Sequence, residues 1–419
     1  MNRSAVREFV APDVSVAPGE VLVPTEVGDA VHGPLPSPAA PLVAGTLLRK
    51  GKRVVHASVG HCADPSGDDG GAVLFVATCQ QRDGSTAAVA AGASPADRVA
   101  VAAARSAVDE WSAVLGTRRL LAGASPWCAG ATQALADARQ AVADHGVLHV
   151  YGELPADPDA LGELAGQGAL FVRSLDEVPD GAAVLFPAHG VPAGVRATAE
   201  ARGLEIIDAT CPLVRHVHAE ARKFAERGDD VLVIGQPGHV AVAGIVGQAP
   251  AVATLVSSPG STAALRVTDS RRVSYLLQPG IPVEDSAPVV AALRSRFPAL
   301  RGPHPDGFCY AASDRAETVR VIASASDAVL VLGAPDDPDS RRLSVLARDA
   351  GAHTHVVSCV TDVTPAMVAG TSVIGLAEST SASPALTAHV TDALSGLGPL
   401  SVTSRRVSTE VVGAPARRS

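Results

Sequence analysis

The sequence predicts an α/β protein made of three lobes of roughly 80–100 residues each, preceded by a smaller α+β domain. Three observations support this fold class. From about residue 118 onward, short apolar runs alternate with helical patterns. Three cysteines, Cys128, Cys211 and Cys309, each lie between a short apolar strand pattern with a turn and an amphipathic helical pattern. Residues 1–117 show neither feature.

The apolar runs include AAVLF (182–186), DVLVIG (230–235), AVLVLG (328–333) and TSVIGL (371–376). They are rich in Val, Ile and Leu, and most end at a glycine or another turn residue. Continuous apolar runs of this kind indicate strands that are buried on both faces. Such strands are typical of a parallel sheet whose strands are joined by crossover helices.

The helix expected after Cys211 has the clearest signals. Pro212 would occupy the first helical position, where proline is favoured because the N–H group it lacks has no partner there. An apolar stripe with a spacing of three and four residues follows, formed by Val214, Val217, Ala221 and Phe224. Cys309 is likewise expected just before a helix begins.

Cysteines in this setting suit metal binding. The positive end of a helix dipole and nearby backbone N–H groups lower the pKa of a thiol, and the thiolate is the form that binds iron. Three thiolates that converge can hold one iron–sulfur cluster and leave one iron without a protein ligand, where a substrate can bind. The alternative is three buried structural cysteines, since Cys is among the most buried residue types.

Residues 1–117 contain a Pro/Gly-rich start, apolar segments near RVVHAS and GAVLFVATC, and a helical pattern in SPADRVAVAAARSAVDEWSAVLG. We predict an extra N-terminal α+β appendage over residues 1–117, without a motif that carries chemistry. Residues 398–419 are expected to form a C-terminal tail.

Composition argues against several classes of function. The formal net charge of -9 and the absence of a basic run argue against a nucleic-acid or membrane partner. No apolar run approaches the ~18–20 residues of a membrane helix, and the N-terminus lacks a secretion pattern. Six cysteines are too few for a disulfide scaffold. We therefore expect a cytoplasmic protein in which Cys62, Cys79 and Cys359 are ordinary buried thiols.

Several strings resemble the 4-hydroxy-3-methylbut-2-enyl diphosphate reductase (IspH or LytB) family, the last enzyme of the methylerythritol phosphate route to isoprenoids. The strings are WCAG, EVPDGAAVLFPAHGV, DATCPLVRHVH, GHVAVAGIVGQ, RFPALRGPHPDGFCYAASDRAE and SRRLSVLA. The resemblance covers residues 118–397. It implies a pseudo-threefold fold with lobes at about 118–203, 204–300 and 301–397. It also implies one central [4Fe–4S] cluster, with Cys128, Cys211 and Cys309 as its ligands.

The resemblance also implies roles for polar residues. His189 in AHGV and His239 in PGHV match two family histidines and are expected to donate hydrogen bonds or protons. The alternative for each is a satisfied polar group at the end of a strand. Gln278 in LLQPG and Ser381 in ESTSAS match polar positions of the substrate pocket.

Other residues of the family pattern are replaced in this chain. The catalytic Glu of the family string GHPEVEG corresponds to Ala241, and its acidic neighbour to Ala243. A substrate-binding histidine corresponds to Ala156, and the threonine after the matched glutamine corresponds to Pro279.

The change that bears most on the substrate is in the segment that binds diphosphate. A Ser-Ser-Asn segment of the family corresponds here to Asp337, Pro338 and Asp339. Ionised carboxylates only accept hydrogen bonds, and like charges at ~4 Å repel by about 4 kcal/mol at an effective dielectric near 20. We therefore expect Asp337 and Asp339 to disfavour a diphosphate. The alternative is that both are solvated surface charges.

These features favour an iron–sulfur oxidoreductase that removes a hydroxyl group reductively. Asp337 and Asp339 favour a neutral or cationic small-molecule substrate, and a ferredoxin or flavodoxin is expected to supply the electrons. Two alternatives remain open. One is a redox-neutral dehydratase or isomerase that uses the cluster as a Lewis acid. The other is a catalytically inactive, cluster-binding scaffold or sensor, which the absence of Glu at position 241 favours.

Overall fold

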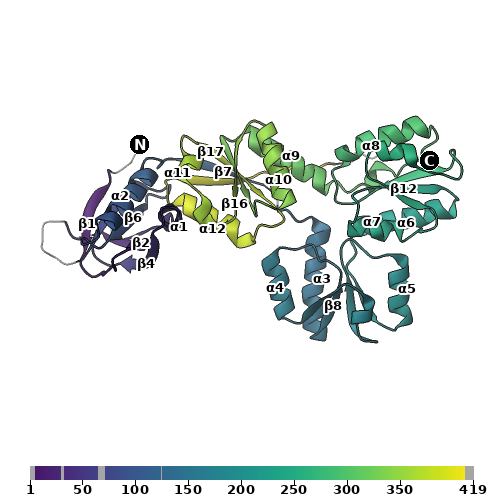
Figure 1. The fold of residues 1–419 in the computed structure, drawn as a ribbon, viewed down its shortest axis with the longest axis horizontal. Helices are drawn as coiled ribbons and strands as arrows, with labels where there is room; N and C mark the ends of the chain where they lie inside the picture. The colour runs from purple at the N-terminus through teal and green to yellow at the C-terminus, as the bar shows by residue number, and fades with distance from the viewer. Residues whose placement is uncertain (1–4, 30–32, 65–70, 124, 411–419) are drawn as a thin grey trace. The chain divides into compact units, whose positions relative to one another are not determined.

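The computed structural model describes residues 5–29, 33–64, 71–123 and 125–410 (Figure 1). These residues contain four β-sheets, and the chain divides into two compact units. The first unit comprises residues 1–124 and 318–405, and the second comprises residues 125–317 and 406–419. The α/β fold class is confirmed, with an α+β domain at the N-terminus.

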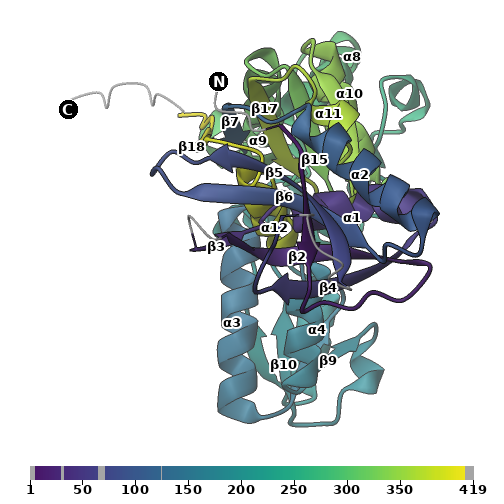
Figure 2. The ribbon, with the colours of Figure 1, turned by 90° about the vertical axis from the view of Figure 1, so that its left-hand side faces the viewer.

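The N-terminal domain is a six-stranded sheet with two helices (Figure 2). The strand order is β1-β5-β6-β2-β3, and β4 pairs with β2. Its strands are β1 (Arg7–Ala11), β2 (Glu20–Asp29), β3 (Gly33–Pro36), β4 (Arg53–Val59), β5 (Ala72–Gln80) and β6 (Thr86–Ala93). Helices α1 (Ala40–Arg49) and α2 (Arg98–Ser112) pack on one face of this sheet.

The rest of the first unit is a five-stranded parallel sheet with the order β16-β15-β17-β7-β18. Its strands are β7 (Arg118–Ala122), β15 (Ala328–Leu332), β16 (His353–Val357), β17 (Val373–Glu378) and β18 (Leu400–Ser404). Helices α9 (Ala311–Ser324) and α10 (Pro338–Asp349) cover one face. On the other face lie α11 (Pro365–Val368), α12 (Pro384–Ser395) and the N-terminal domain.

The lobe boundaries differ from those we predicted at two strands. We placed residues 118–122 in the first lobe and residues 398–404 in the tail, but β7 and β18 pair with each other, and β7 also pairs with β17. Both strands therefore complete the third lobe. Pairing between parallel strands joins residues far apart in the chain, so a local apolar pattern does not reveal it.

The N-terminal domain shares a hydrophobic core with the five-stranded sheet. Trp111 and Leu47 belong to the same buried cluster as Leu330 and Ile374. Helix α1 lies directly against the 3-10 turn η4 (Val360–Asp362), so that a Cβ atom at Gly45 would overlap the backbone. The segment that the sequence presents as an appendage is therefore fused to the third lobe through its core.

The second unit holds two parallel sheets, each with helices on both faces (Figure 1). The first has the order β11-β10-β8-β9 and is formed by β8 (Leu148–Tyr151), β9 (Ala169–Val172), β10 (Ala183–Phe186) and β11 (Glu205–Asp208). Its helices are α3 (Ala129–His145), α4 (Pro158–Gly166) and α5 (Ala193–Ala201).

The second sheet of this unit has the order β13-β12-β14. It is formed by β12 (Asp230–Ile234), β13 (Ala253–Val256) and β14 (Val273–Leu277), with helices α6 (Pro212–Glu226), α7 (Val240–Val246) and α8 (Val283–Arg296). The apolar stripe predicted for α6 is confirmed, because Val214, Val217, Ala221 and Phe224 are all buried. No helix in the described ranges combines the length and apolar character that a membrane crossing requires.

Candidate functional site

Each of the three cysteines lies where the chain passes from one lobe to the next. Cys128 follows β7 of the five-stranded sheet and is the N-cap of α3, which packs on β8. Cys211 follows β11 and is the N-cap of α6, which packs on β12. Cys309 follows α8 and precedes α9, which packs on β15. Each of the three thiols thus lies in a connection that leads into a helix.

One of these connections differs from the predicted pattern. A strand was expected before Cys309, but the chain there forms the short 3-10 turn η3 (Pro305–Gly307). Pro303 and Pro305 explain the difference, since proline lacks the N–H group that a strand needs for its ladder. The helix expected after Cys309 begins at Ala311, as α9.

Gly130 lies against two of the three thiols. A Cβ atom at Gly130 would be 2.7 Å from the Sγ atom of Cys211 and 3.9 Å from that of Cys128. Real Cβ atoms essentially never come as close as the shorter of these distances. Only glycine therefore leaves room for both sulfur atoms at the start of α3.

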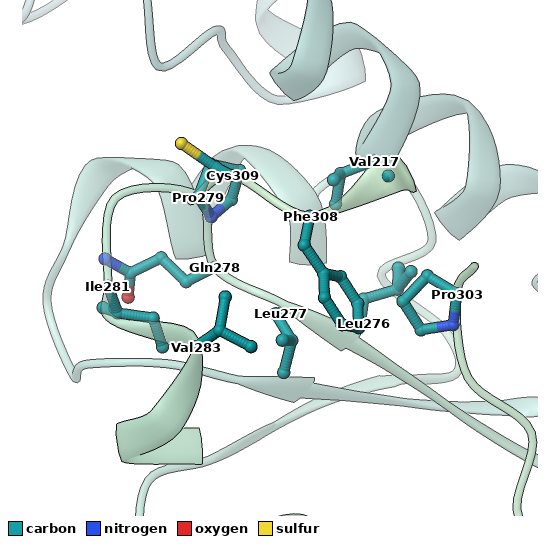
Figure 3. Close-up of a pocket in the computed structure, with 11 residues that line it drawn as sticks. Val217, Leu276, Leu277, Gln278, Pro279, Ile281, Val283, Pro303, Phe308 and Cys309 are labelled. Atoms are coloured by element: carbon teal, nitrogen blue, oxygen red, sulfur yellow. The ribbon is translucent and has the colours of Figure 1, made fainter. Parts of the chain in front are cut away.

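The third thiol is held by backbone N–H groups, next to a turn that lies against α6. Cys309 accepts hydrogen bonds from the N–H groups of Gly280 and Ala311. His216 of α6 lies against the η3 turn, so that its ring would be only 3.0 Å from a Cβ atom at Gly307. Figure 3 shows the Cys309 sulfur directed away from the apolar side chains of a pocket lined by Val217, Phe308 and others.

The three thiols are close enough to influence one another's ionisation. Burial raises the pKa of Cys309, and the negative charges of Cys128 and Cys211 raise it further, against the two backbone N–H donors. The sequence predicts that the helix N-terminus lowers the pKa of this thiol. Burial and the neighbouring thiols outweigh that effect, so the pKa is raised. Three thiolates in one place repel each other unless a positively charged metal group lies among them.

The three cysteines have the chemistry of iron–sulfur ligands. Among the described residues, no three Cys, His, Asp or Glu side chains are placed to hold one metal ion. The cysteines of an iron–sulfur cluster stand farther apart because each binds a different iron atom. Soft thiolates are the ligands that such clusters use, and the N–H groups at Cys309 are suited to hydrogen-bond the sulfur atoms.

His189 and His239 form a pair in the same unit. Their ring centroids are 5.2 Å apart, with an interplanar angle of 74°. His189 lies in the turn after β10, and His239 is the N-cap of α7, where its Nδ1 atom accepts the N–H of Ala241 at 3.1 Å. The structure thus brings together the two histidines that the sequence singled out.

Both histidines are neutral at pH 7. Burial lowers the pKa of His189 to about 4, helped by the charge that His239 carries when protonated. Burial also lowers the pKa of His239, and the negative charge of Glu153 opposes this shift only in part. The pair can donate hydrogen bonds but adds no positive charge that would attract an anion.

Gln278 follows β14 and is 2% exposed. Its side-chain Oε1 atom accepts the backbone N–H of Gln236 at 2.7 Å. Gln236 belongs to the loop that carries His239, so Gln278 fixes this loop from the neighbouring strand. This contact assigns Gln278 a structural role, beside the substrate contact that the sequence predicts for it.

Ser381, Asp337 and Asp339 lie in the first unit, at the carboxyl ends of β15 and β17. Asp337 is the N-cap of α10 and accepts hydrogen bonds from Ser340 N, at 3.0 Å, and from Ser381 Oγ, also at 3.0 Å. Asp339 accepts the N–H of Thr380 at 2.9 Å. Burial opposes ionisation of Asp337, but these donors outweigh it and hold its pKa below the usual range. Both carboxylates are therefore held in place by hydrogen bonds.

Two of the replaced family residues are buried. Ala241, where a catalytic Glu was expected from the family pattern, is 0% exposed, and Ala156, in place of a histidine, is 8% exposed. Neither supplies a polar group to the site.

Glu153 and Gly130 were missed by sequence reasoning. Glu153 is exposed in the loop after β8 and acts on His239 through its charge. The signal was present, because polar residues just after parallel strands gather at the carboxyl edge of a sheet, where ligands bind. Nothing in the local pattern distinguishes Gly130 from the other glycines of the chain.

A family model described as LytB protein matches residues 120–395. The chain is 40% identical over 271 residues to "4-hydroxy-3-methylbut-2-enyl diphosphate reductase 2" of Mycobacterium bovis, covering 64% of this chain and 82% of the relative. It is 39% identical over 285 residues to a reductase named for the same substrate in Xanthomonas oryzae pv. oryzae, covering 67% of this chain and 90% of the relative.

Solved structures with a similar fold include the "E-1-hydroxy-2-methyl-but-2-enyl-4-diphosphate reductase from Plasmodium falciparum", with a TM-score of 0.60 and 22% identity. That match covers 72% of this chain and 96% of the other. A structure described as the terminal enzyme of the non-mevalonate pathway matches with a TM-score of 0.54 and 21% identity, over 66% and 99% of the two chains. At these identities the structures support the fold.

Proposed function

Because this chain belongs to the LytB protein family, we propose that it is an iron–sulfur reductase that removes a hydroxyl group from a small molecule. The family is one of oxidoreductases in isoprenoid biosynthesis, and the named relatives are reductases of 4-hydroxy-3-methylbut-2-enyl diphosphate. The observation that carries the proposal is the convergence of Cys128, Cys211 and Cys309.

The three cysteines would hold a [4Fe–4S] cluster. When bound by three thiolates, such a cluster supplies electrons and an iron position at which a hydroxyl group can bind. Gly130 leaves room for two of the sulfur atoms, and the N–H groups of Gly280 and Ala311 would offset part of the negative charge at Cys309.

Reductive dehydroxylation consumes two electrons and two protons, and releases the hydroxyl group as water. We propose a ferredoxin or flavodoxin as the electron donor, since no other redox group is implied by the chain. His189 and His239, both neutral, would hold the substrate by donating hydrogen bonds.

The substrate of this chain is proposed to lack the diphosphate of the relatives. Asp337 and Asp339 stand where the family has neutral donors. Their carboxylates already accept hydrogen bonds from the backbone N–H groups of Ser340 and Thr380 and from the hydroxyl group of Ser381. A further family donor, the substrate-binding histidine, is absent at Ala156. Held carboxylates at the carboxyl ends of β15 and β17 favour a neutral or cationic molecule over an anion.

The test is protein purified without oxygen, analysed for iron and acid-labile sulfide. Wild-type protein is expected to contain both, and Cys211→Ser is expected to lose most of them. Cys359→Ser is the control, since Cys359, which the sequence predicts to be buried, is an exposed thiol in the first unit. Equal iron in wild type and Cys211→Ser would contradict the proposal. Turnover without electron consumption would favour the redox-neutral dehydratase or isomerase.

A further inference from the structure

The N-terminal domain carries a cleft that plays no part in the proposed reduction. The cleft lies where β2, β3, β4 and the start of α1 meet α12, and its volume is about 530 Å³. Helix α12 lies directly against α1 here, so that a Cβ atom at Gly396 would overlap the backbone of Ala39. All of these elements belong to the first unit. A cleft of this size can hold a small molecule.

Ser37 supplies the buried polar group of this cleft. Its backbone is bonded on both sides, because its N–H donates to the carbonyl of Thr25 at 3.0 Å and its own carbonyl accepts the N–H of Ala40 at 2.9 Å. The residue is 5% exposed, yet its Oγ atom has no hydrogen-bond partner among the described residues. Buried hydroxyl groups are nearly always bonded in native proteins. Because Ser37 lines the cleft, a bound molecule can supply the missing partner.

The start of α1 offers no free N–H group to an anion. The N–H of Ala40 donates to the carbonyl of Ser37. Those of Leu42 and Val43 both donate to the carbonyl of Ala39, and the intervening proline has no N–H group. Anion sites at helix N-termini depend on free N–H groups. No Lys or Arg is among the described residues that line the cleft, so the cleft does not suit an anion.

The other polar groups of the cleft can all accept hydrogen bonds. The Nδ1 atom of His56 lies 3.1 Å from the carbonyl of Val23, which can only accept, so Nδ1 carries the proton. In the neutral ring, Nε2 is then an acceptor. Asp392 is exposed and adds a negative charge, and Thr25 adds a hydroxyl group. A matching ligand must therefore bring hydrogen-bond donors, and a positive charge favours it further.

We propose that this cleft binds a small aliphatic molecule that carries a primary ammonium group. An ammonium group has N–H donors for the acceptors of the cleft and a positive charge for Asp392. Pro36, Pro38 and Pro41 line the cleft as apolar surfaces that suit the methylene groups of such a molecule. Of the described residues that line the cleft, Asp392 alone lies in the region that the family model matches. The site therefore goes beyond the proposed reductase function.

The experiment is calorimetric titration of the full-length protein with putrescine, 1,4-butanediol and succinate. These probes share one carbon chain length and carry positive, neutral and negative ends. Putrescine is expected to bind at least about tenfold more tightly than the diol, and succinate is expected not to bind. In ¹⁵N spectra of labelled histidine, the Nε2 signal of His56 should shift when putrescine is added.

Two variants test the residues that carry the proposal. Asp392→Asn removes the charge and should weaken putrescine binding by about tenfold. Ser37→Ala should weaken it by about threefold or more, without lowering the midpoint of chemical denaturation, since its hydroxyl group has no partner to lose. A serine with only a structural role would change the midpoint and leave the affinity unchanged.

Glu26→Gln is the matched control, because Glu26 is an exposed carboxylate of β2 that does not line the cleft. It is expected to leave the affinity for putrescine unchanged. Binding of the diol or of succinate as tight as that of putrescine would overturn the proposal. So would a lack of putrescine binding at about 10 mM, or an affinity that Asp392→Asn and Ser37→Ala both leave intact. These titrations need neither iron nor electrons, so their outcome is independent of the reductase proposal.

Discussion

Gly130 decides whether two of the three thiols can share one site. A Cβ atom at this position, in the first turn of α3, would lie 2.7 Å from the sulfur of Cys211. A side chain there must push Cys211 away or unwind the start of the helix. The single hydrogen atom of glycine is therefore as necessary to the proposed metal site as the three cysteines are.

We predict that Gly130→Ala lowers the affinity for the cluster on the order of tenfold or more, because the added methyl group displaces the Cys211 sulfur. Iron and sulfide per chain after anaerobic purification give the measurement. Gly162→Ala, an exposed glycine of α4 with open space around it, is the control and should keep its iron. A Gly130→Ala protein with a full complement of iron would show that the thiols do not converge as described.

Asp337 and Asp339 are the residues on which the substrate proposal depends most. We predict that the double variant Asp337→Ser and Asp339→Asn binds 4-hydroxy-3-methylbut-2-enyl diphosphate at least about tenfold more tightly than wild type. Serine at position 337 preserves a helix N-cap. Asp349→Asn removes the same charge from the other end of α10 and should change nothing. Tight binding of the diphosphate to wild type, measured by calorimetry, would contradict this prediction.

At the scale of elements, α6 links the proposed metal site to the histidine pair. The helix begins next to Cys211 and carries His218 two turns later, wedged against the turn that follows His189. The ring of His218 would be 2.7 Å from a Cβ atom at Gly190 and 3.1 Å from one at Gly244. Burial lowers the pKa of His218 to about 4, and the positive charges of Arg222 and Arg196 add to this shift. The negative charge of Asp208 opposes it only in part.

This burial predicts a pH dependence of stability. Below the unfolded pKa of about 6.5, the unfolded chain takes up a proton at His218 that the folded chain refuses. The free energy of unfolding should therefore fall as the pH decreases from about 6.5 to about 4, and the loss should level off below that. His218→Gln should reduce this slope in chemical denaturation series, and His304→Gln, at an exposed histidine, should not. Identical slopes would show that His218 is not buried as a neutral ring.

The sequence predicts the elements better than their pairing. Pro212 and the apolar stripe place α6 correctly, and the continuous apolar runs mark β10, β12, β15 and β17 as buried strands. The addition of β7 and β18 to the five-stranded sheet was not predictable, because each pairs with a strand distant in the chain. A strand was predicted before Cys309, but two prolines prevent it and the chain forms a 3-10 turn there.

The candidate site could also be predicted only where local sequence patterns define it. The cysteines and both histidines could be named from motifs, since each motif carries its residue at the end of a strand or the start of a helix. Glu153 and Gly130 act through contacts between different lobes, and the hydrogen bond from Gln236 to Gln278 joins two loops far apart in the chain, so no local pattern contains them.

At the scale of the molecule, the N-terminal domain and the five-stranded sheet behave as one body within the first unit. Trp111 of α2 is 0% exposed, and its Nε1 atom donates a hydrogen bond to Thr46 of α1 at 3.0 Å. The cluster that contains Trp111 continues into β15, β17 and α12. The domain therefore stabilises the lobe on which it packs.

We predict that Trp111→Ala lowers the free energy of unfolding by about 3–5 kcal/mol, because it opens a cavity in this shared core. The loss should appear as faster amide hydrogen exchange in the N-terminal sheet and in β15 (Ala328–Leu332) alike. Leu48→Ala, at an exposed side chain of α1, is the control and should change the free energy of unfolding by less than about 0.5 kcal/mol. Unchanged exchange in β15 would show that the two parts unfold separately.

The most direct measurement is the Mössbauer spectrum of full-length protein grown on ⁵⁷Fe and purified without oxygen. Three cysteine ligands predict a four-iron cluster in which one iron differs from the other three. A spectrum without a four-iron cluster, or one in which all four irons are equivalent, would contradict the account.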